Sequence, residues 1–297
     1  MSLGSVIFVL GRSVYANVQS TPQPSNSTAI LVPAGAAGGE TEGTAAPYPS
    51  TIELTETRLI ADVDVALLGL SHGNPDDLDV LLVGPGGQSV LLMSDGAGAD
   101  TARRIDLGFS DEAAAMIPDE GPLASGGYQP SNYEGDADAF DAPAPPGPYG
   151  ASLSVFDGTT PTGTWSLYVM DDAAGGVGRI AGGWALRLTL APLVSIANAR
   201  TREGNLSGSS LEFVVTLSSA PEADVSVDFA TSDGTATAPG DYQAKSGTIT
   251  FSAGETARSI FVNVSGDLVR EPDEVMYVTL SNLVGVAEFA DAKAKGT

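Results

Sequence analysis

Residues 79–93 have the sequence DVLLVGPGGQSVLLM, in which two apolar runs flank a centre rich in glycine and proline. A short apolar run that stops at such a turn signal is typical of a β-strand, because glycine and proline interrupt regular structure. The second run follows at the distance expected in a β-hairpin. The stretch therefore predicts two antiparallel strands joined by a turn over residues 84–87.

Short strands are predicted on both sides of this hairpin. Apolar and polar residues alternate over residues 62–67, 164–169 and 183–188, as in half-buried strands. Segments of helical length with an apolar period of 3.6 are missing. We therefore expect a nearly all-β domain, a sandwich or jelly roll. Residues 164–169 and 183–188 are expected to pair, with Trp165 and Trp184 as core residues on adjacent strands.

Residues 121–150 are rich in glycine, proline, serine and aspartate, and they predict a long surface loop. The alternating pattern restarts after Ala191, with segments such as 211–217 and 225–229 separated by turns. A series of short strands of this kind is typical of an immunoglobulin-like β-sandwich.

The chain therefore divides into three predicted parts. Residues 1–27 are an irregular lead-in, or a signal or cloning remnant. Residues 28–191 form the first domain. Residues 192–297 form the second domain, which the printed sequence truncates at its C-terminal end.

The composition excludes several classes of function. The 297 residues include 37 acidic and 13 basic residues, and the formal net charge is -24. A chain this acidic cannot neutralise phosphates, so we expect no nucleic-acid partner. There is no cysteine, which excludes disulfides and zinc-thiolate sites. No segment has the length of a membrane span. Acidity without cysteine favours an extracellular or cell-surface location, in a bacterium, and we expect a monomer.

Catalytic machinery is also not indicated. His72 is the single histidine of the sequence, and no Gly-x-Ser-x-Gly nucleophile elbow accompanies it. A Ser-His-Asp triad needs such a serine against the histidine. We therefore predict that the chain is not an enzyme and that His72 has a structural, hydrogen-bonded role.

Two groups of acidic residues are candidate metal sites. Residues 271–274 (EPDE) follow Asp267 in a loop, where clustered carboxylates are suited to Ca²⁺. The alternative is a solvated acidic loop. In the first domain, Asp77 and Asp79 lie on one side of the start of a strand, and Asp171 and Asp172 begin a glycine-rich loop, so that convergence of the two pairs at one sheet end is a hypothesis. These pairs are predicted either to share a calcium ion or, for Asp77, to cap local backbone amides.

The first domain resembles the P domain (P/homo B domain) of proprotein convertases, kexins and bacterial subtilisin-like proteases. The resemblance implies a β jelly roll that follows a protease catalytic domain and that is itself non-catalytic. It extends over about 160 residues and rests on PYPS (47–50), LSHGNPDDLD (70–79), LLVGPGG (81–87), GTWSL (163–167), GRI (178–180) and WAL (184–186).

The second domain resembles a Calx-beta domain, on REG (202–204), TSDGTA (231–236), GDY (240–242), FSAGET (251–256) and EPDE (271–274). Calcium-binding members of that family hold the ion with loop carboxylates. Two departures imply a weak site or none: Gly266 stands where those members have a further acid, and the sequence stops at Thr297 before an acidic cluster. The resemblance implies that the ligand positions are taken by Glu203, Asp233, Asp267, Glu271 and Glu274.

These resemblances predict a non-catalytic accessory part of a secreted subtilisin-like serine protease. The P domain would stabilise or gate a catalytic domain elsewhere in the parent chain, and the Calx-beta module would give calcium-dependent rigidity or binding. The alternative is an adhesion or matrix module of a bacterial surface protein, strung together with other β modules and without protease activity.

Overall fold

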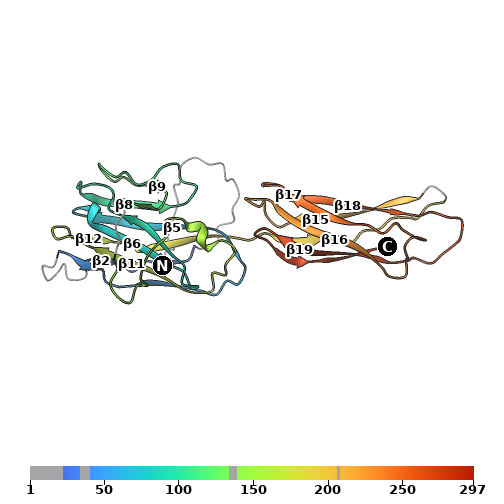
Figure 1. Ribbon diagram of the computed structural model, residues 1–297, viewed down its shortest axis with the longest axis horizontal. Helices are drawn as coiled ribbons and strands as arrows, with labels where there is room; N and C mark the ends of the chain where they lie inside the picture. The colour runs from blue at the N-terminus through green and yellow to red at the C-terminus, as the bar shows by residue number, and fades with distance from the viewer. Residues whose placement is uncertain (1–22, 34–40, 134–138, 206–207) are drawn as a thin grey trace, which may run out of the picture. The chain divides into compact units, whose positions relative to one another are not determined.

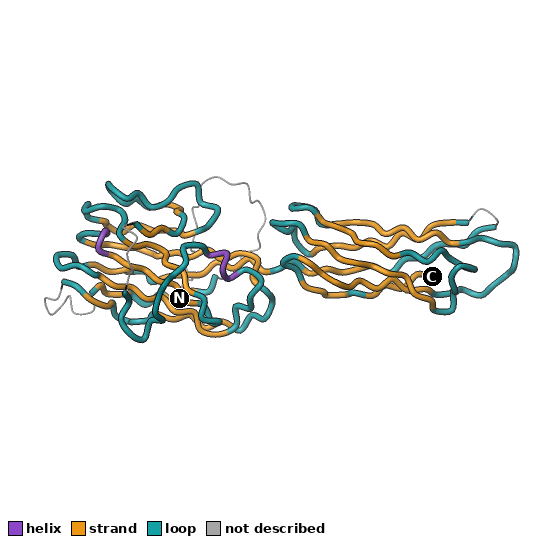
Figure 2. Tube along the Cα trace, in the orientation of Figure 1, coloured by secondary structure: helices purple, strands orange, loops and turns teal. Residues whose placement is uncertain are grey.

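The computed structural model describes residues 23–33, 41–133, 139–205 and 208–297, and it divides into two compact units, Met1–Thr189 and Leu190–Thr297. Both units contain many strands and almost no helix (Figures 1 and 2), so the predicted all-β class is confirmed. Over the described residues, no helix is long and apolar enough to cross a membrane. Residues 1–22 of the predicted lead-in lie outside the described residues.

Two sheets form the first unit. In the first sheet the order is β1-β13-β5-β12-β2, and β8 pairs with both β5 and β9. Ser25 and Asn26, which belong to the stretch predicted to be irregular, form the edge strand of this sheet opposite Ala185 and Trp184. The strands are β1 (Ser25–Asn26), β2 (Ile30–Val32), β5 (Ile60–His72), β8 (Ala102–Phe109), β9 (Gly126–Tyr128), β12 (Gly178–Ile180) and β13 (Trp184–Leu190).

The second sheet has the order β10-β7-β6-β11-β3, with β4 beside β11. It contains the predicted hairpin, in which Val80 to Val83 pair antiparallel with Met93 to Ser89. Gly87 closes the turn with a φ of 85°, a conformation that a side chain disfavours. The strands are β3 (Gly43–Thr44), β4 (Ser50–Leu54), β6 (Leu78–Val83), β7 (Ser89–Ser94), β10 (Ser131–Asn132) and β11 (Gly163–Asp171), with short 3₁₀ helices η2 (Pro75–Asp77) and η3 (Leu153–Phe156).

Trp165 and Trp184 are both fully buried, as predicted for core residues. The prediction that they lie on adjacent, paired strands is wrong, because β11 belongs to one sheet and β13 to the other. Both strands face the same core from opposite layers, and the alternating pattern does not distinguish this from pairing. The Trp184 indole donates to Ser50 Oγ at 2.9 Å, a contact that joins the two layers.

The predicted loop 121–150 contains two short strands, β9 and β10. Its proline-rich part packs on the outer face of the second sheet, where Phe140 and Tyr149 meet with their ring centroids 5.6 Å apart. Tyr168 of β11 donates a hydrogen bond to the carbonyl oxygen of Pro143 at 3.3 Å. Aromatic side chains therefore give this segment apolar area to bury, which a loop of polar residues would lack.

The second unit has two four-stranded sheets over its described residues, with the orders β18-β15-β14-β20 and β17-β16-β19-β21. Alternating apolar residues of both sheets, among them Phe213, Val227 and Phe251, form a separate core. The strands are β14 (Leu193–Ile196), β15 (Ser209–Leu217), β16 (Val225–Asp233), β17 (Ser246–Phe251), β18 (Ala257–Val264), β19 (Met276–Val284), β20 (Glu288–Asp291) and β21 (Lys293–Gly296).

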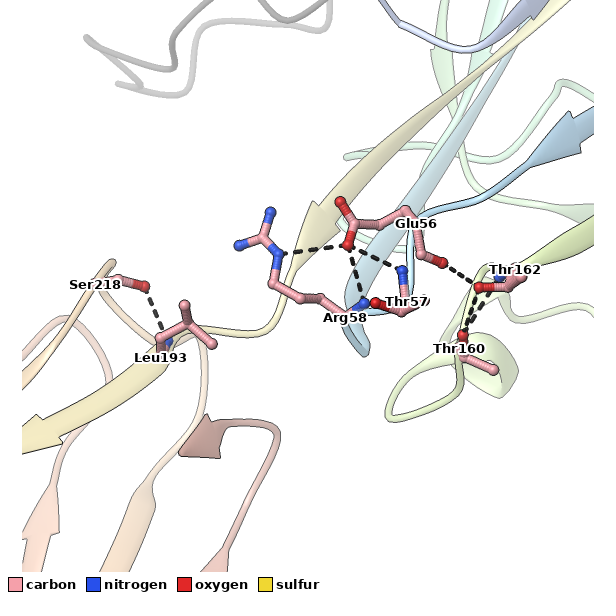
Figure 3. A network of polar contacts seen from close by, with 7 residues as sticks. All are labelled: Glu56, Thr57, Arg58, Thr160, Thr162, Leu193 and Ser218. Atoms are coloured by element: carbon pink, nitrogen blue, oxygen red, sulfur yellow. Dashed lines mark hydrogen bonds and ion pairs between the residues drawn. The ribbon is translucent and has the colours of Figure 1, made fainter. Parts of the chain in front are cut away.

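Figure 3 shows two local polar networks, one in each unit. In the first unit, Glu56 Oε1 accepts from the backbone amides of Thr57 and Arg58, each at 3.0 Å. In the second, the Leu193 amide donates to Ser218 Oγ at 2.9 Å, at the start of β14. In each network a side-chain oxygen accepts a hydrogen bond from a backbone amide, which satisfies that amide.

Candidate metal centre

Acidic side chains gather at one end of the second unit. Strands β14, β16 and β18 end there, and β19 begins there. The loops next to these strand ends therefore meet. Glu203 follows β14, Asp241 follows β16, and Glu271 and Glu274 precede β19. The fold thus brings together four acids that are up to about seventy residues apart in sequence.

Asp241, Glu271 and Glu274 form the centre of this group. Each offers a carboxylate oxygen, and these oxygens all lie within 4.8 Å of one another. They line an open pocket of about 250 Å³ that Glu203 also lines. Oxygen donors at this spacing are what a hard cation such as Ca²⁺ binds.

The carboxylates of the group repel one another. The pKa of Glu274 is raised by loss of surrounding water and by the charges of Asp241 and Glu271. The pKa of Glu271 is likewise raised by loss of water and by Asp267, Asp241 and Glu203. A bound cation would offset this repulsion.

Glu203 and Asp267, both predicted ligands, are joined to each other by a hydrogen bond. The backbone amide of Asp267 donates to Glu203 Oε1 at 3.1 Å. Asp267 Oδ1 in turn accepts from the backbone amide of Val269 at 2.6 Å. Both acids therefore lie beside the group and add charge to it, since both act on the pKa of Glu271.

The structure gives Asp233 a different partner. Its Oδ1 accepts from the hydroxyl of Tyr242 at 2.6 Å and from the backbone amide of Ala238 at 3.0 Å. These donors lower the pKa of Asp233. Asp241, which was not among the predicted ligands, is grouped with Glu271 and Glu274. The sequence signal for Asp241 was its place in the GDY motif, 240–242.

The residue at position 266 is crowded by backbone. A Cβ built on Gly266 would lie 2.9 Å from the carbonyl oxygen of Gly204 and 3.0 Å from the amide nitrogen of Gly208. It would also lie 3.1 Å from the carbonyl oxygen of Glu203. An acidic side chain at position 266 would therefore require the loop over Glu203 and Gly204 to move.

Three of the four candidate aspartates of the first unit contact protein groups through a carboxylate oxygen, while Asp171 Oδ1 is buried without a hydrogen-bond partner. Asp171 is buried and its Oδ2 lies 3.1 Å from His72 Nε2. Asp79 is buried and accepts from Ser94 Oγ at 2.7 Å, and Asp77 accepts from the Asn74 side-chain amide at 2.6 Å.

These contacts leave the shared calcium site as a prediction. The amide of Asp172 donates to the carbonyl oxygen of Asp77 at 3.1 Å, and the charge of Asp77 raises the pKa of Asp171, so the two pairs do lie near each other. Within the described ranges, however, the four aspartates do not supply three ligand atoms within 4.8 Å. The Asp77 carboxylate accepts from a side-chain amide, and its capping of backbone amides likewise stays a prediction.

In a comparison with known protein families, residues 195–294 match the model of the Calx-beta domain. Sodium/calcium exchanger 1 of Canis lupus familiaris is 48% identical over 67 residues, which are 23% of this chain and 7% of the exchanger. The chain therefore spans a small part of that relative's length.

Two solved structures are also similar over part of the chain. The calcium binding domain CBD12 of CALX1.1 has a TM-score of 0.31 at 24% identity, covering 35% of this chain and 44% of that one. The apo form of the Calx CBD1 domain has a TM-score of 0.30 at 21% identity, covering 35% and 97%. The family match, which contains every acid of the group, identifies residues 195–294 as a Calx-beta domain.

Proposed function

We propose that the second unit binds Ca²⁺ through Asp241, Glu271 and Glu274, with Glu203 and Asp267 as further ligands or as supporting charges. The observation that carries the proposal is the approach of the three carboxylate oxygens to within 4.8 Å of one another. Three like charges at this spacing are unfavourable unless protons or a cation neutralise them.

The choice of ion rests on the donor set. All the donors are oxygen atoms on irregular loops, and Ca²⁺ accepts six to eight such ligands in flexible geometry, whereas Mg²⁺ demands a near-ideal octahedron. The relative that is 48% identical over 67 residues supports the same ion, since it is a sodium/calcium exchanger. The ion would tie together three loops and so make this end of the sandwich more rigid.

Calorimetric titration of the full chain with CaCl₂ tests the proposal. The double variant Glu271→Gln/Glu274→Gln removes two ligand charges and is expected to weaken binding by more than about tenfold. Asp273→Asn is the matched control, because Asp273 lies in the same loop but pairs with Arg200 at 2.9 Å. Equal calcium binding by the double variant and the control would overturn the proposal.

For the first unit, we propose the non-catalytic role of a P domain, attached to a subtilisin-like serine protease in a secreted or surface protein. Its motif residues Trp165 and Trp184 are core residues, which suits a structural module. His72 is buried, with Nδ1 at 2.7 Å from the Asn74 carbonyl oxygen and Nε2 facing Asp171. Both ring nitrogens are occupied, so His72 is not placed to act as a general base on a substrate.

The parent gene tests this second proposal. A subtilisin-like catalytic domain encoded upstream of the first unit would support it. A parent protein without such a domain, and with further Calx-beta copies downstream, would favour the adhesion or matrix module instead. The extracellular or cell-surface location remains a prediction, and secretion of the parent protein would test it.

A further inference from the structure

A second group of acids lies in the first unit. It shares no residue with Asp241, Glu271 and Glu274, called here the Calx-beta group, or with the aspartates near His72. Asp62 and Asp64 alternate along β5 and so lie on the same side of that strand. Glu112 follows β8, which pairs antiparallel with β5 so that Val65 faces Phe109. One oxygen from each of these three acids lies within 4.8 Å of the other two.

The register explains why the three acids meet. Beyond the Val65 and Phe109 pair, the antiparallel register leads from Asp64 to Ser110 and from Asp62 to Glu112. The turn that carries Glu112 is fixed by hydrogen bonds, since the Ser110 amide donates to the carbonyl oxygen of Tyr128 at 3.0 Å.

An independent observation concerns Asp64. The residue is only 2% exposed, and its Oδ1 is buried without a hydrogen-bond partner. The nearby Ser110 hydroxyl donates its hydrogen to Glu112 Oε2 at 2.8 Å. An unpartnered carboxylate oxygen in the interior carries a desolvation cost, which a cation at that oxygen would offset.

Arg187 of β13 pairs with one oxygen of Asp64. Its guanidinium lies 2.9 Å from Asp64 Oδ2, the oxygen other than the unpartnered one. Arg187 therefore pairs with Oδ2, and Oδ1 of the same carboxylate is left without a hydrogen bond.

We propose that Asp62, Asp64 and Glu112 form a second calcium site, on the outer side of the first sheet of the first unit. The ligands are carboxylate oxygens, with the Ser110 hydroxyl oxygen beside them, and this is a donor set for a hard divalent cation. The site uses none of the residues of the Calx-beta group, so a result for one site does not decide the other.

Tryptophan fluorescence offers a selective test, because both tryptophans of the sequence, Trp165 and Trp184, belong to the first unit. The full chain carries Glu271→Gln and Glu274→Gln throughout, so that the Calx-beta group is disabled. Thermal unfolding is followed by tryptophan emission in EDTA, in CaCl₂ and in MgCl₂. Calcium is expected to raise the midpoint of this transition, and magnesium to raise it less.

Substitutions then locate the site. Glu112→Gln, at an exposed position, is expected to abolish the calcium-dependent rise and to weaken calcium binding in titration by at least about tenfold. Glu120→Gln is the matched exposed control and should keep the rise. Asp77→Asn tests the aspartates near His72.

Either of two results would overturn the proposal. One is a tryptophan transition that calcium does not move in the Glu271→Gln/Glu274→Gln chain. The other is a rise that survives Glu112→Gln, whether or not Asp77→Asn removes it. The proposed calcium site of the Calx-beta domain is untouched by both results, because its test is a titration of the other unit.

Discussion

The hydroxyl of Tyr242 donates a 2.6 Å hydrogen bond to Asp233 Oδ1, and this contact ties the connection between β16 and β17 back to the last residue of β16. Tyr242 is only 2% exposed, so its hydroxyl has little access to water as an alternative partner. Asp233 Oδ1 is thus occupied by protein donors, and Asp241 lies with the other carboxylates.

Tyr242→Phe is expected to destabilise the second unit. The variant removes a hydrogen bond to a charged acceptor, and its calorimetric transition should move down by a few degrees at neutral pH. Because Tyr242 lowers the pKa of Asp233, the contact stabilises the folded state above the ordinary pKa of Asp233 and this stabilisation is lost on acidification. The difference in unfolding midpoint between Tyr242→Phe and the unsubstituted chain should therefore shrink as the pH falls below the ordinary pKa of Asp233. A constant difference would contradict this role.

Calcium binding by the Calx-beta domain is expected to depend on pH. The pKa values of Glu271 and Glu274 are raised, so protons compete with the cation at a higher pH than they would for an ordinary glutamate. Titrations at several pH values should show a calcium affinity that falls as the pH falls, with protons released on binding. In the apo protein the sign is opposite: raised pKa values favour folding at low pH, and this contribution is lost as the pH rises.

Gly266→Ala is expected to cost about 1–3 kcal/mol of unfolding free energy in the second unit, as overpacking does. The new methyl group would meet the backbone of Gly204 and Gly208, which cannot rotate away as a side chain can. Gly240→Ala is the control, because a Cβ there lies 3.6 Å from its nearest neighbour, the Thr237 carbonyl oxygen. Chemical denaturation of both variants gives the comparison, and equal stabilities would contradict the crowding.

The buried pair of His72 and Asp171 should stabilise the first unit, since both side chains are fully buried. His72→Ala leaves the Asp171 carboxylate without that partner and is expected to cost about 3–5 kcal/mol. The tryptophan transition measures this loss. A variant as stable as the unsubstituted chain would show that the pair contributes nothing.

The same pair predicts a pH effect. Burial, above all, raises the pKa of Asp171 from 3.8 to about 6. The folded state therefore holds this proton more tightly than the unfolded state, and the contribution favours folding at low pH and is lost as the pH rises through about 6. Asp171→Asn should flatten the dependence of the tryptophan transition on pH between those two values.

Much of the fold was accessible from the pattern of residues. The hairpin over residues 79–93 was predicted because its apolar runs and its glycine turn are local signals, and strands β6 and β7 confirm it. The sequence pattern did not show to which of the two sheets each strand belongs. Trp165 and Trp184 have the same local pattern, and only the packing of the two layers separates them.

The candidate sites follow the same division. Glu271 and Glu274 are close in sequence, so a loop of acids was visible. Asp241 joins them only because the turn after β16 reaches the same end of the sandwich. Asp62 and Asp64 were visible as two acids on one strand, but the approach of Glu112 depends on the register of β8. Long-range register is set by the burial of the whole face, and no short motif records it.

The connection between β18 and β19, residues 265–275, bears on how readily proteases cleave the protein. It exposes Leu268 at 72% and Val269 at 64%, next to Arg270, a site that trypsin recognises. An ion held by Glu271 and Glu274 would immobilise the chain just after the peptide bond that follows Arg270. Because a protease needs an extended, mobile substrate, the ion would slow cleavage of that bond. The calcium concentration around the protein would then set how long this loop survives uncut.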